Sequence, residues 1–468
     1  MSKDDTRSGR LSRREFVGAS VAAAALRGGG SSARAQQERQ VAPGMRRINA
    51  NAPKNVILMI SDGMSPGVMQ LADDFSLARR DRHTLWMELC QSDRATTTMM
   101  STGSANGPVT DSAAAGTAFS TGLRANNGAL CVLPDGARPT PLGQRLKAAN
   151  RATGLVTTTN VAHATPAAFI ANHPSRHEYD AIASQMLAKR ADVMLGGGRE
   201  HFTESRTKTF APAATVWRTR EELLAGLPSE GPVIGLFNED HLDYEMDRPD
   251  DQPSLSEMTD AALARLATDP NGFFLMVEGG RVDHAAHAND ILSLLHDQLA
   301  FDDAVRIAQR FADERGDTLL IVTSDHANAN PGLTHYADKG ARGFAKLATG
   351  EGEDSFGAIY NSLGHRREPA AFIDALERAR KITLRDTERL AIERVMSGEP
   401  MNAFRDMDKL WTVLGGVLAN HYSVAFCSPN HTADHVWLTT MGPMARRVPT
   451  NRHITDLHAY IASALRLA

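Results

Sequence analysis

Six short apolar runs recur along the chain, and stretches with helical spacing separate them. The first run, KNVILMIS at residues 54–61, is almost unbroken, which is typical of a strand buried on both faces. The other five are GLVTT (154–158), DVMLG (192–196), FFLMVE (273–278), TLLIVTS (318–324) and HVWLTT (435–440). Strands that alternate with helices predict an α/β fold in three layers, with a mostly parallel central sheet covered by helices on both faces.

The clearest helical periodicity lies in residues 285–313, where apolar side chains such as Ile291, Leu295 and Leu299 recur at helical intervals. The composition changes over residues 327–430, which begin with Gly- and Asn-rich segments and a charged loop. Helical segments are expected there at about 368–397 and 407–419. We interpret about 340–420 as an insertion before the last sheet strand of a single domain of residues 36–468. Most of the insertion is expected to form surface helices without a part in the chemistry.

The N-terminus has the features of an export signal. Arg13 and Arg14 form a twin-arginine pair, an apolar run follows at residues 16–26, and Ala33-Arg34-Ala35 matches an A-x-A cleavage site. The run is too short to span a bilayer. The sequence therefore predicts a signal peptide at residues 1–35, recognised by the twin-arginine export machinery, and a mature chain in the periplasm or outside the cell without a membrane anchor.

Charge and cysteine content exclude some classes of protein. The first 35 residues carry seven Lys/Arg and three Asp/Glu, so their removal changes the net charge from −4 to −8. This charge argues against nucleic-acid binding through a general basic surface. An anionic substrate would need local positive charge, for which bound metal is the natural source. Cys90, Cys131 and Cys427 allow at most one internal disulfide, so the chain is no disulfide scaffold, and their pairing stays open.

The segment VTDSAAAGTAFSTG at residues 109–122 places Asp111 and Ser112 just before a run of small helix-forming residues. One interpretation is structural, with Asp111 as the N-cap and Ser112 as the first helical residue. The other is chemical, because the free N–H groups and positive dipole at a helix N-terminus favour an anion. A serine at that point suits attack on phosphorus. Taken alone, the segment favours the structural interpretation.

Carboxylates and histidines follow the predicted strands. Asp62 follows the first run, Glu278 ends the fourth, and Asp325 and His326 follow the fifth. Because the carboxyl ends of parallel strands share one edge of a sheet, these side chains are expected to lie close together. One such aspartate would usually be a turn residue, but several with ligand-type side chains indicate a metal site.

Asp283 and His287 lie four residues apart in VEGGRVDHAAHAND (277–290), so a helix would place them on one face. A carboxylate and an imidazole in that arrangement suit zinc. His431, in NHTADHV before the last predicted strand, could supply a third ligand. The alternative is an exposed first turn of a helix and a structural histidine.

Together these motifs resemble the alkaline phosphatase family. The matching segments occur in family order and span residues 55–440: ILMISDGMS (57–65), VTDSAAAGTAFSTG (109–122), NVAHATPAAFIANH (160–173), DVMLGGG (192–198), VEGGRVDHAAH (277–287), TSDHA (323–327) and NHTADH (430–435). The resemblance implies hydrolysis of phosphate monoesters to alcohol and inorganic phosphate through a phosphoserine. It also implies an alkaline pH optimum, because deprotonated serine and water are better nucleophiles.

The resemblance implies a role for each matching residue. Ser112 would be the nucleophile, Arg176 would clamp the phosphate, and Asp111 would orient Arg176. Two zinc ions and one magnesium are expected as cofactors. Their ligands would be Asp283, His287 and His431 for one zinc, Asp62, Asp325 and His326 for the other, and Asp62, Thr165 and Glu278 for magnesium.

Two positions vary within the family. This chain has His163 and His284 where some members have an aspartate and a lysine. Both are expected to stand behind the primary ligands and to tune metal and phosphate affinity. The histidine pair implies weaker retention of magnesium and faster release of product.

Two other functions remain as alternatives. A phosphodiesterase or sulfatase of the same superfamily would have related metal sites, but Arg176 suits a monoester terminus and Ser112 differs from the threonine or modified cysteine of those relatives. A non-catalytic periplasmic protein that binds metal or phosphate would need no nucleophile. The physiological ester, the metals bound in the cell and the role of the insertion stay open. Many family members are homodimers, but this sequence alone shows no dimer surface.

Overall fold

The computed structural model describes residues 52–467 except 190, 227, 229, 350–353, 366 and 451. The predicted signal peptide, residues 1–35, lies outside the described residues. No helix in the described part of the chain is long and apolar enough to cross a membrane.

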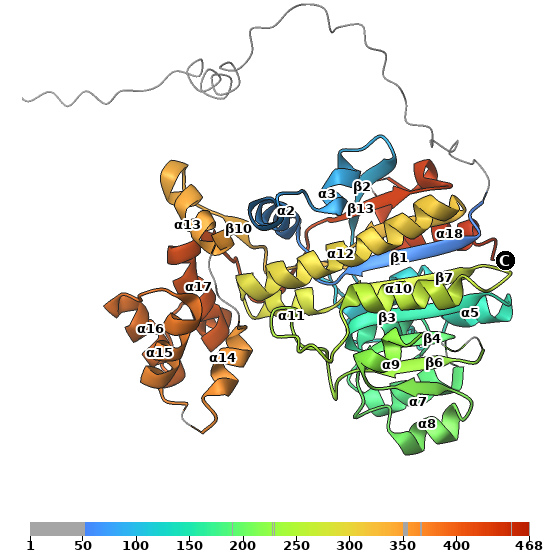
Figure 1. Cartoon of the computed structure of the whole chain (residues 1–468), viewed down its shortest axis with the longest axis horizontal. Helices are drawn as coiled ribbons and strands as arrows, with labels where there is room; N and C mark the ends of the chain where they lie inside the picture. Colours follow the sequence, from blue (N-terminus) through green and yellow to red (C-terminus); the bar gives the residue numbers. More distant parts are fainter. Residues whose placement is uncertain are drawn as a thin grey trace, which may run out of the picture. The chain divides into compact units, whose positions relative to one another are not determined.

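A large sheet forms the centre of the described chain (Figure 1). Its strands are, in spatial order, β14 (Arg452–His453), β2 (Ala95–Ser101), β13 (Val436–Met441), β8 (Thr318–Thr323), β1 (Asn55–Ser61), β7 (Phe273–Gly279), β3 (Ala152–Asn160), β4 (Val193–Gly197), β6 (Val233–Leu236) and β5 (Thr215–Trp217). All six predicted strands are present. Only β13 among these strands runs antiparallel to its neighbours, β2 and β8. The predicted mostly parallel sheet is confirmed.

The strand β1 shows why the apolar runs lack polar positions. It pairs in parallel with β7 on one side and with β8 on the other. Val56, Leu58 and Ile60 pack into the core on one face of the sheet, and Ile57 and Met59 pack into the core on the other. A strand covered on both faces needs apolar side chains at every position.

Helices cover both faces of the sheet. On one face lie α2 (Pro66–Arg80), α3 (Leu85–Cys90), α9 (Arg220–Leu224), α10 (Leu255–Leu266), α11 (Arg281–His287) and α12 (Ile291–Arg315). On the other face lie α4 (Ser112–Thr121), α5 (Leu142–Ala148), α6 (Ala164–Ala168), α7 (Tyr179–Lys189), α8 (Glu204–Phe210) and α18 (Thr455–Ala464). Figure 1 shows α10 and α12 crossing in front of β1 and β7.

Five helices form a group between two short paired strands. The strands β10 (Gly332–Leu333) and β11 (Val424–Ala425) pair antiparallel, so the intervening chain leaves and returns at one stem. The helices between them are α13 (Ala337–Thr349), α14 (Phe356–Ser362), α15 (Pro369–Arg380), α16 (Asp386–Met396) and α17 (Leu410–Tyr422), with the short 3-10 helix η1 (Arg405–Asp408) before the last. A second 3-10 helix, η2 (Ala445–Arg447), follows β13. A second short pair is formed by β9 (Ala327–Asn328) and β12 (His431–Thr432).

Two helix predictions were too simple. The predicted helix at 285–313 is two helices, α11 and α12, because Asn289 has a positive φ of 51° and Asp290 caps the start of α12. The predicted segment at 368–397 is also two helices, α15 and α16, since Lys381 adopts a left-handed conformation after α15.

A buried ion pair fastens the inserted helices to the sheet domain. Oδ1 of Asp290 lies 3.3 Å from Nη2 of Arg380 on α15, and both side chains are almost fully buried. Oδ2 of Asp290 accepts hydrogen bonds from the backbone N–H of Phe356, at the start of α14, and from the hydroxyl of Ser293. One carboxylate thus caps α12 and holds two of the inserted helices.

We expect Arg380→Met to lower the free energy of unfolding by about 3–5 kcal/mol, because the change leaves the Asp290 carboxylate buried without a counter-charge. Urea unfolding at neutral pH measures the effect. Arg394→Ala is the control, because it removes an exposed ion pair to Glu399 and should change the stability by at most about 1 kcal/mol. Equal, small effects of both changes would contradict the role given to the buried pair.

Candidate active site

Ser112 is the first residue of α4, at the positive end of that helix. Asp111 is the N-cap, and its Oδ1 accepts a hydrogen bond from the backbone N–H of Ala114 at 3.0 Å. The hydroxyl of Ser112 is almost fully buried and lies 3.2 Å from Nε2 of His326. The structural interpretation of the segment is therefore correct for Asp111, and it also places the serine where an anion is favoured.

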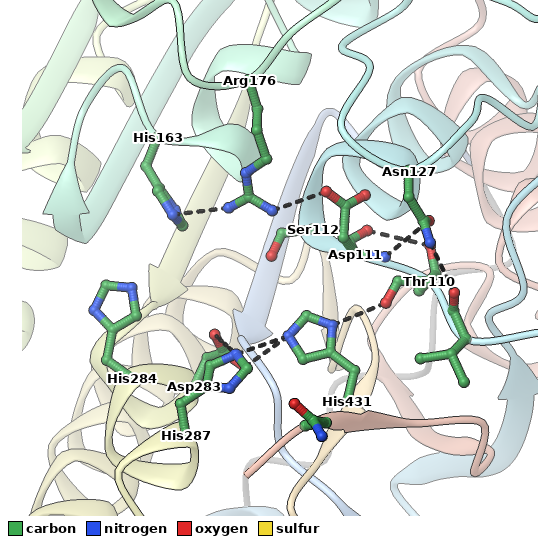
Figure 2. A pocket seen from close by; sticks show the side chains of 12 residues that line it. Thr110, Asp111, Ser112, Asn127, His163, Arg176, Asp283, His284, His287 and His431 are labelled. Carbon is green, nitrogen blue, oxygen red and sulfur yellow. Dashed lines mark hydrogen bonds and ion pairs between the residues drawn. The ribbon is translucent and has the colours of Figure 1, made fainter. Parts of the chain in front are cut away.

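The second carboxylate oxygen of Asp111 holds Arg176. Oδ2 accepts hydrogen bonds from Nη1 of Arg176 and from the backbone N–H of Gly128, both at 3.0 Å. Nη2 of Arg176 donates to Nε2 of His163 at 2.9 Å, so the guanidinium is held from both sides (Figure 2). Burial by itself would lower the pKa of Arg176, but the charges of Asp111 and Asp62 raise it, so the group stays cationic.

Asp283, His287 and His431 bring three ligand-type groups together. The helix α11 places Asp283 and His287 one turn apart, and the pairing of β12 with β9 brings His431 opposite them. Nε2 of His287 lies 3.0 Å from Nε2 of His431, and the two atoms lie 3.3 Å and 3.5 Å from the Asp283 carboxylate.

Backbone carbonyls decide which nitrogen of these two rings is free. Nδ1 of His287 donates to the carbonyl of Pro429 at 2.6 Å, and Nδ1 of His431 donates to the carbonyl of Thr110 at 2.8 Å. In the neutral rings both Nε2 lone pairs therefore face each other and a carboxylate, an arrangement that a cation stabilises. Burial lowers the pKa of His431, but the charge of Asp283 outweighs it and raises the pKa to about 9. The same balance raises the pKa of His287.

A second group lies at the carboxyl edge of the sheet, where β1 and β8 end side by side. Asp62 follows β1, and Asp325 and His326 follow β8, all fully buried. Nε2 of His326 lies 3.5 Å from Oδ1 of Asp62 and 3.2 Å from Oδ2 of Asp325. Both oxygens of Asp62 and Oδ2 of Asp325 are buried without a hydrogen-bond partner. Burial first, and then neighbouring carboxylates, raise the pKa of Asp62 well above its usual value and that of Asp325 to about 7.

Asp62 also belongs to a third group, with Glu278 at the end of β7. Oε2 of Glu278 accepts a hydrogen bond from the hydroxyl of Thr157, whereas Oε1 is buried without a partner. The hydroxyl of Thr165, on α6, is likewise buried without a partner. A nitrogen of His163 and the carboxylate oxygens of Asp62 and Glu278 lie within 4.8 Å of one another. The structure thus places His163 in one group with Asp62 and Glu278.

A cavity of about 500 Å³ lies over the first group and is also lined by His163 of the third (Figure 2). Its lining residues are Val109, Thr110, Asp111, Ser112, Asn127, His163, Arg176, Asp283, His284, His287, Asn430 and His431. The remaining ligand-type residues do not line the cavity: Asp62, Thr165, Glu278, Asp325 and His326. A nucleophile, a guanidinium and sites for cations therefore converge on one space, an arrangement suited to phosphoryl transfer.

Sequence reasoning missed two residues beside this cavity. Arg281 donates through Nη1 to Nδ1 of His284 at 2.8 Å. His241 packs edge-on against His284 and His163, with ring centroids 4.5 Å and 5.4 Å apart. Arg281 lies within VEGGRVDHAAH (277–287), the motif that contains Asp283 and His287. His241 follows β6 at the same sheet edge as the other site residues, which is the signal that could have found it.

Comparison with known proteins agrees with this geometry. The alkaline phosphatase family model matches residues 53–467. Alkaline phosphatase 4 of Bacillus subtilis is 36% identical over 284 residues, which are 58% of this chain and 61% of the relative. Streptomycin-6-phosphate phosphatase of Streptomyces griseus is 35% identical over 64% of this chain and 79% of its own length. The first of these matches thus spans about three fifths of the relative's length.

Similarity of structure extends over more of the chain. The crystal structure of Thermus thermophilus alkaline phosphatase superposes with a TM-score of 0.83 and 32% sequence identity, covering 89% of this chain and 92% of the other. The fold, the order of the motifs and the residues around the cavity point to the same conclusion. The chain belongs to the alkaline phosphatase family.

Proposed function

We propose that the protein hydrolyses phosphate monoesters, with Ser112 as the residue that accepts the phosphoryl group. One observation carries the proposal: the Ser112 hydroxyl lies at a helix N-terminus in the cavity that Arg176 closes, 3.2 Å from His326. This position combines a nucleophile, anion-favouring backbone N–H groups and a guanidinium that matches two phosphate oxygens.

The residues of the three groups fit bound cations. Asp283, His287 and His431 would hold one zinc, and Asp62, Asp325 and His326 a second, because imidazole and carboxylate are common zinc ligands. Asp62, Thr165 and Glu278 would hold magnesium through oxygens that are buried without partners. When bound, these cations supply charge that stabilises the attacking and leaving oxygens and lowers the pKa of coordinated groups.

Asp111, Arg176 and Ser112 each have a defined part in the proposed reaction. Asp111 orients Arg176, which binds two non-bridging oxygens of the phosphate. The oxygen of Ser112 loses its proton and attacks phosphorus in line. A bond from Oγ to phosphorus forms as the ester P–O bond breaks, and the departing oxygen takes up a proton and leaves as the alcohol. Water then attacks from the opposite side, which releases inorganic phosphate and restores Ser112. With two non-bridging oxygens bound to Arg176, a monoester keeps a third for the cations, whereas a diester has none left, so the arrangement favours a monoester.

We further propose that the protein acts after export. The twin arginines, the short apolar run and the A-x-A site in residues 1–35 support export by the twin-arginine route. That route carries folded proteins, so the site would be assembled before translocation.

Residues 36–468 with zinc and magnesium should hydrolyse p-nitrophenyl phosphate, with rates that increase above neutral pH, and should act poorly on a phosphodiester. Ser112→Ala should lower the rate by about 10³-fold or more, because water must then attack without the nucleophile. Ser205→Ala is the matched control, since Ser205 is an exposed residue of α8. No monoester turnover by the folded, metal-loaded protein, or full turnover by Ser112→Ala, would refute the proposal.

We expect a change in one proposed zinc group to remove its own metal and to leave the metal of the other group in place. His431→Ala should remove one zinc per chain and leave the other, because it breaks only the group with Asp283 and His287. Asp325→Ala should affect the second zinc instead. Mass spectrometry of metals after gel filtration gives the count. His435→Ala, an exposed histidine in the same segment, should keep the full content, and loss of zinc in that control would show that the effect is not specific.

Magnesium should be the metal lost first on gentle dialysis, with activity that returns when magnesium is added. Burial, and then the charge of Arg176, lower the pKa of His163 well below its usual value, so the ring is neutral and, unlike a carboxylate, offers a cation no negative charge. His163→Asp adds a carboxylate and should therefore slow the loss of magnesium, as measured by metal content and residual activity against dialysis time. Equal loss from both proteins would argue against this role for His163.

A further inference from the structure

We propose that Arg281 is a positioning residue that fixes His284 in the tautomer whose Nε2–H faces the cavity, where it serves as a neutral hydrogen-bond donor to phosphate. The inference rests on the proposed function of the site. It concerns a residue that does not line the cavity and that acts only through a second side chain.

The contact between the two side chains sets the direction of the hydrogen bond. Nη1 of Arg281 lies 2.8 Å from Nδ1 of His284. A guanidinium has no acceptor atom, so Nδ1 must accept, and the proton of the neutral ring is on Nε2. Nε2 is on the opposite side of the ring from Nδ1. Because His284 lines the cavity beside His163, that N–H is available to a ligand there (Figure 2).

Arg281 is itself held in place by other elements. Its guanidinium carbon lies 3.8 Å from the centroid of the Tyr244 ring, so the planar group stacks on an aromatic face. Its backbone N–H donates to the hydroxyl of Thr158 at 3.1 Å. Asp297 is buried nearby, and burial raises the pKa of its carboxyl well above its usual value although the charge of Arg281 lowers it. The contacts with Tyr244 and Thr158 thus fix the donor that faces His284.

The rings around His284 limit its rotation. The His241 ring packs edge-on against it at 4.5 Å, and the His163 ring does so at 5.6 Å. Each of these neighbours also accepts a hydrogen bond at one nitrogen, His241 from the backbone N–H of Asn160 and His163 from Arg176. A ring flip of His284 would exchange Nδ1 for carbon and break the contact with Arg281. The orientation and the tautomer of His284 are therefore specified together.

A purely structural role for Arg281 is the competing explanation, because the guanidinium also packs on the Tyr244 ring. The two explanations differ in what should happen when His284 is absent. If Arg281 acts through His284, its replacement should matter for phosphate only while that ring is present. If Arg281 only supports the fold, the effect should be the same in both backgrounds.

The test is a double-mutant cycle on inorganic phosphate with the metal-loaded protein. Arg281→Met should raise the dissociation constant of phosphate roughly threefold to tenfold, the effect of one misdirected hydrogen bond. In the His284→Ala background the same change should have almost no effect. Titration calorimetry gives the constants directly, and competitive inhibition by phosphate gives a second value.

Nitrogen NMR of histidine-labelled protein reads the tautomer itself. The signals that vanish in His284→Ala assign the ring, which should carry its proton on Nε2 in the parent protein and lose that preference in Arg281→Met. If Arg281→Met does not fold, Tyr244→Leu tests the same link, because it keeps the guanidinium but removes the ring that holds it. That variant should also weaken phosphate binding only while His284 is present.

The possible results distinguish failure of the proposed function from failure of the role given to Arg281. A parent protein that neither binds phosphate nor hydrolyses monoesters refutes the proposed function. A parent protein that does both, with equal weakening by Arg281→Met in the two backgrounds or with the proton of His284 on Nδ1, refutes the role of Arg281. Coupling in the cycle together with Nε2–H in the parent protein supports it.

Discussion

Buried carboxylates that lie close together are the constraint on which this structure depends. Asp62, Asp325 and Glu278 end neighbouring strands of a parallel sheet, and all three are fully inaccessible to solvent. Repulsion among them raises the pKa of Asp62 in addition to the larger effect of burial. Such a cluster is stable only with cations or protons among the oxygens. At this edge of the sheet the fold therefore loses stability that bound cations or protons would restore.

On the side of the cavity where an anion would bind, single residues serve both the local structure and the site. Asp111 uses one oxygen to cap α4 and the other to hold Arg176. The cap is thus part of the candidate site, since the helix that begins with Ser112 is capped by the residue that holds the guanidinium. Backbone carbonyls act in a similar way on His287 and His431, because each takes the Nδ1 proton and leaves Nε2 for a ligand. The atoms that stabilise the local structure thus also position the polar groups of the site.

Sequence patterns were a good guide where a residue's position follows from regular structure. The apolar runs gave the inner strands, and the rule that parallel strands share an edge explains why Asp62, Glu278 and Asp325 meet. Periodicity could not show the break between α11 and α12, because apolar spacing continues across a turn that depends on the backbone of Asn289. The apolar pattern does not predict the strand β2, because its sequence ATTTMMS is rich in threonine and the strand is only half-buried.

Other parts of the site depend on contacts between distant segments. Arg281 and His284 are three residues apart, yet the role inferred for them depends on Tyr244 and on the neighbouring ring of His241, which reach the site from a loop after β6. No local pattern specifies such a contact. The same holds for the ring nitrogens of the zinc-type ligands, since the carbonyl that orients His431 belongs to Thr110, more than 300 residues earlier.

The paired strands β10 and β11 have a consequence for how this chain can diverge. The inserted helices begin and end side by side, so the distance that the chain must close is independent of what lies between. The entropy of closing such a loop grows only slowly with its length. The length of the inserted segment can therefore change at this stem without moving His431, a few residues beyond β11, as long as the buried Asp290 keeps a counter-charge such as Arg380. The stem thus separates a segment whose length is adjustable from the strand that carries a candidate metal ligand.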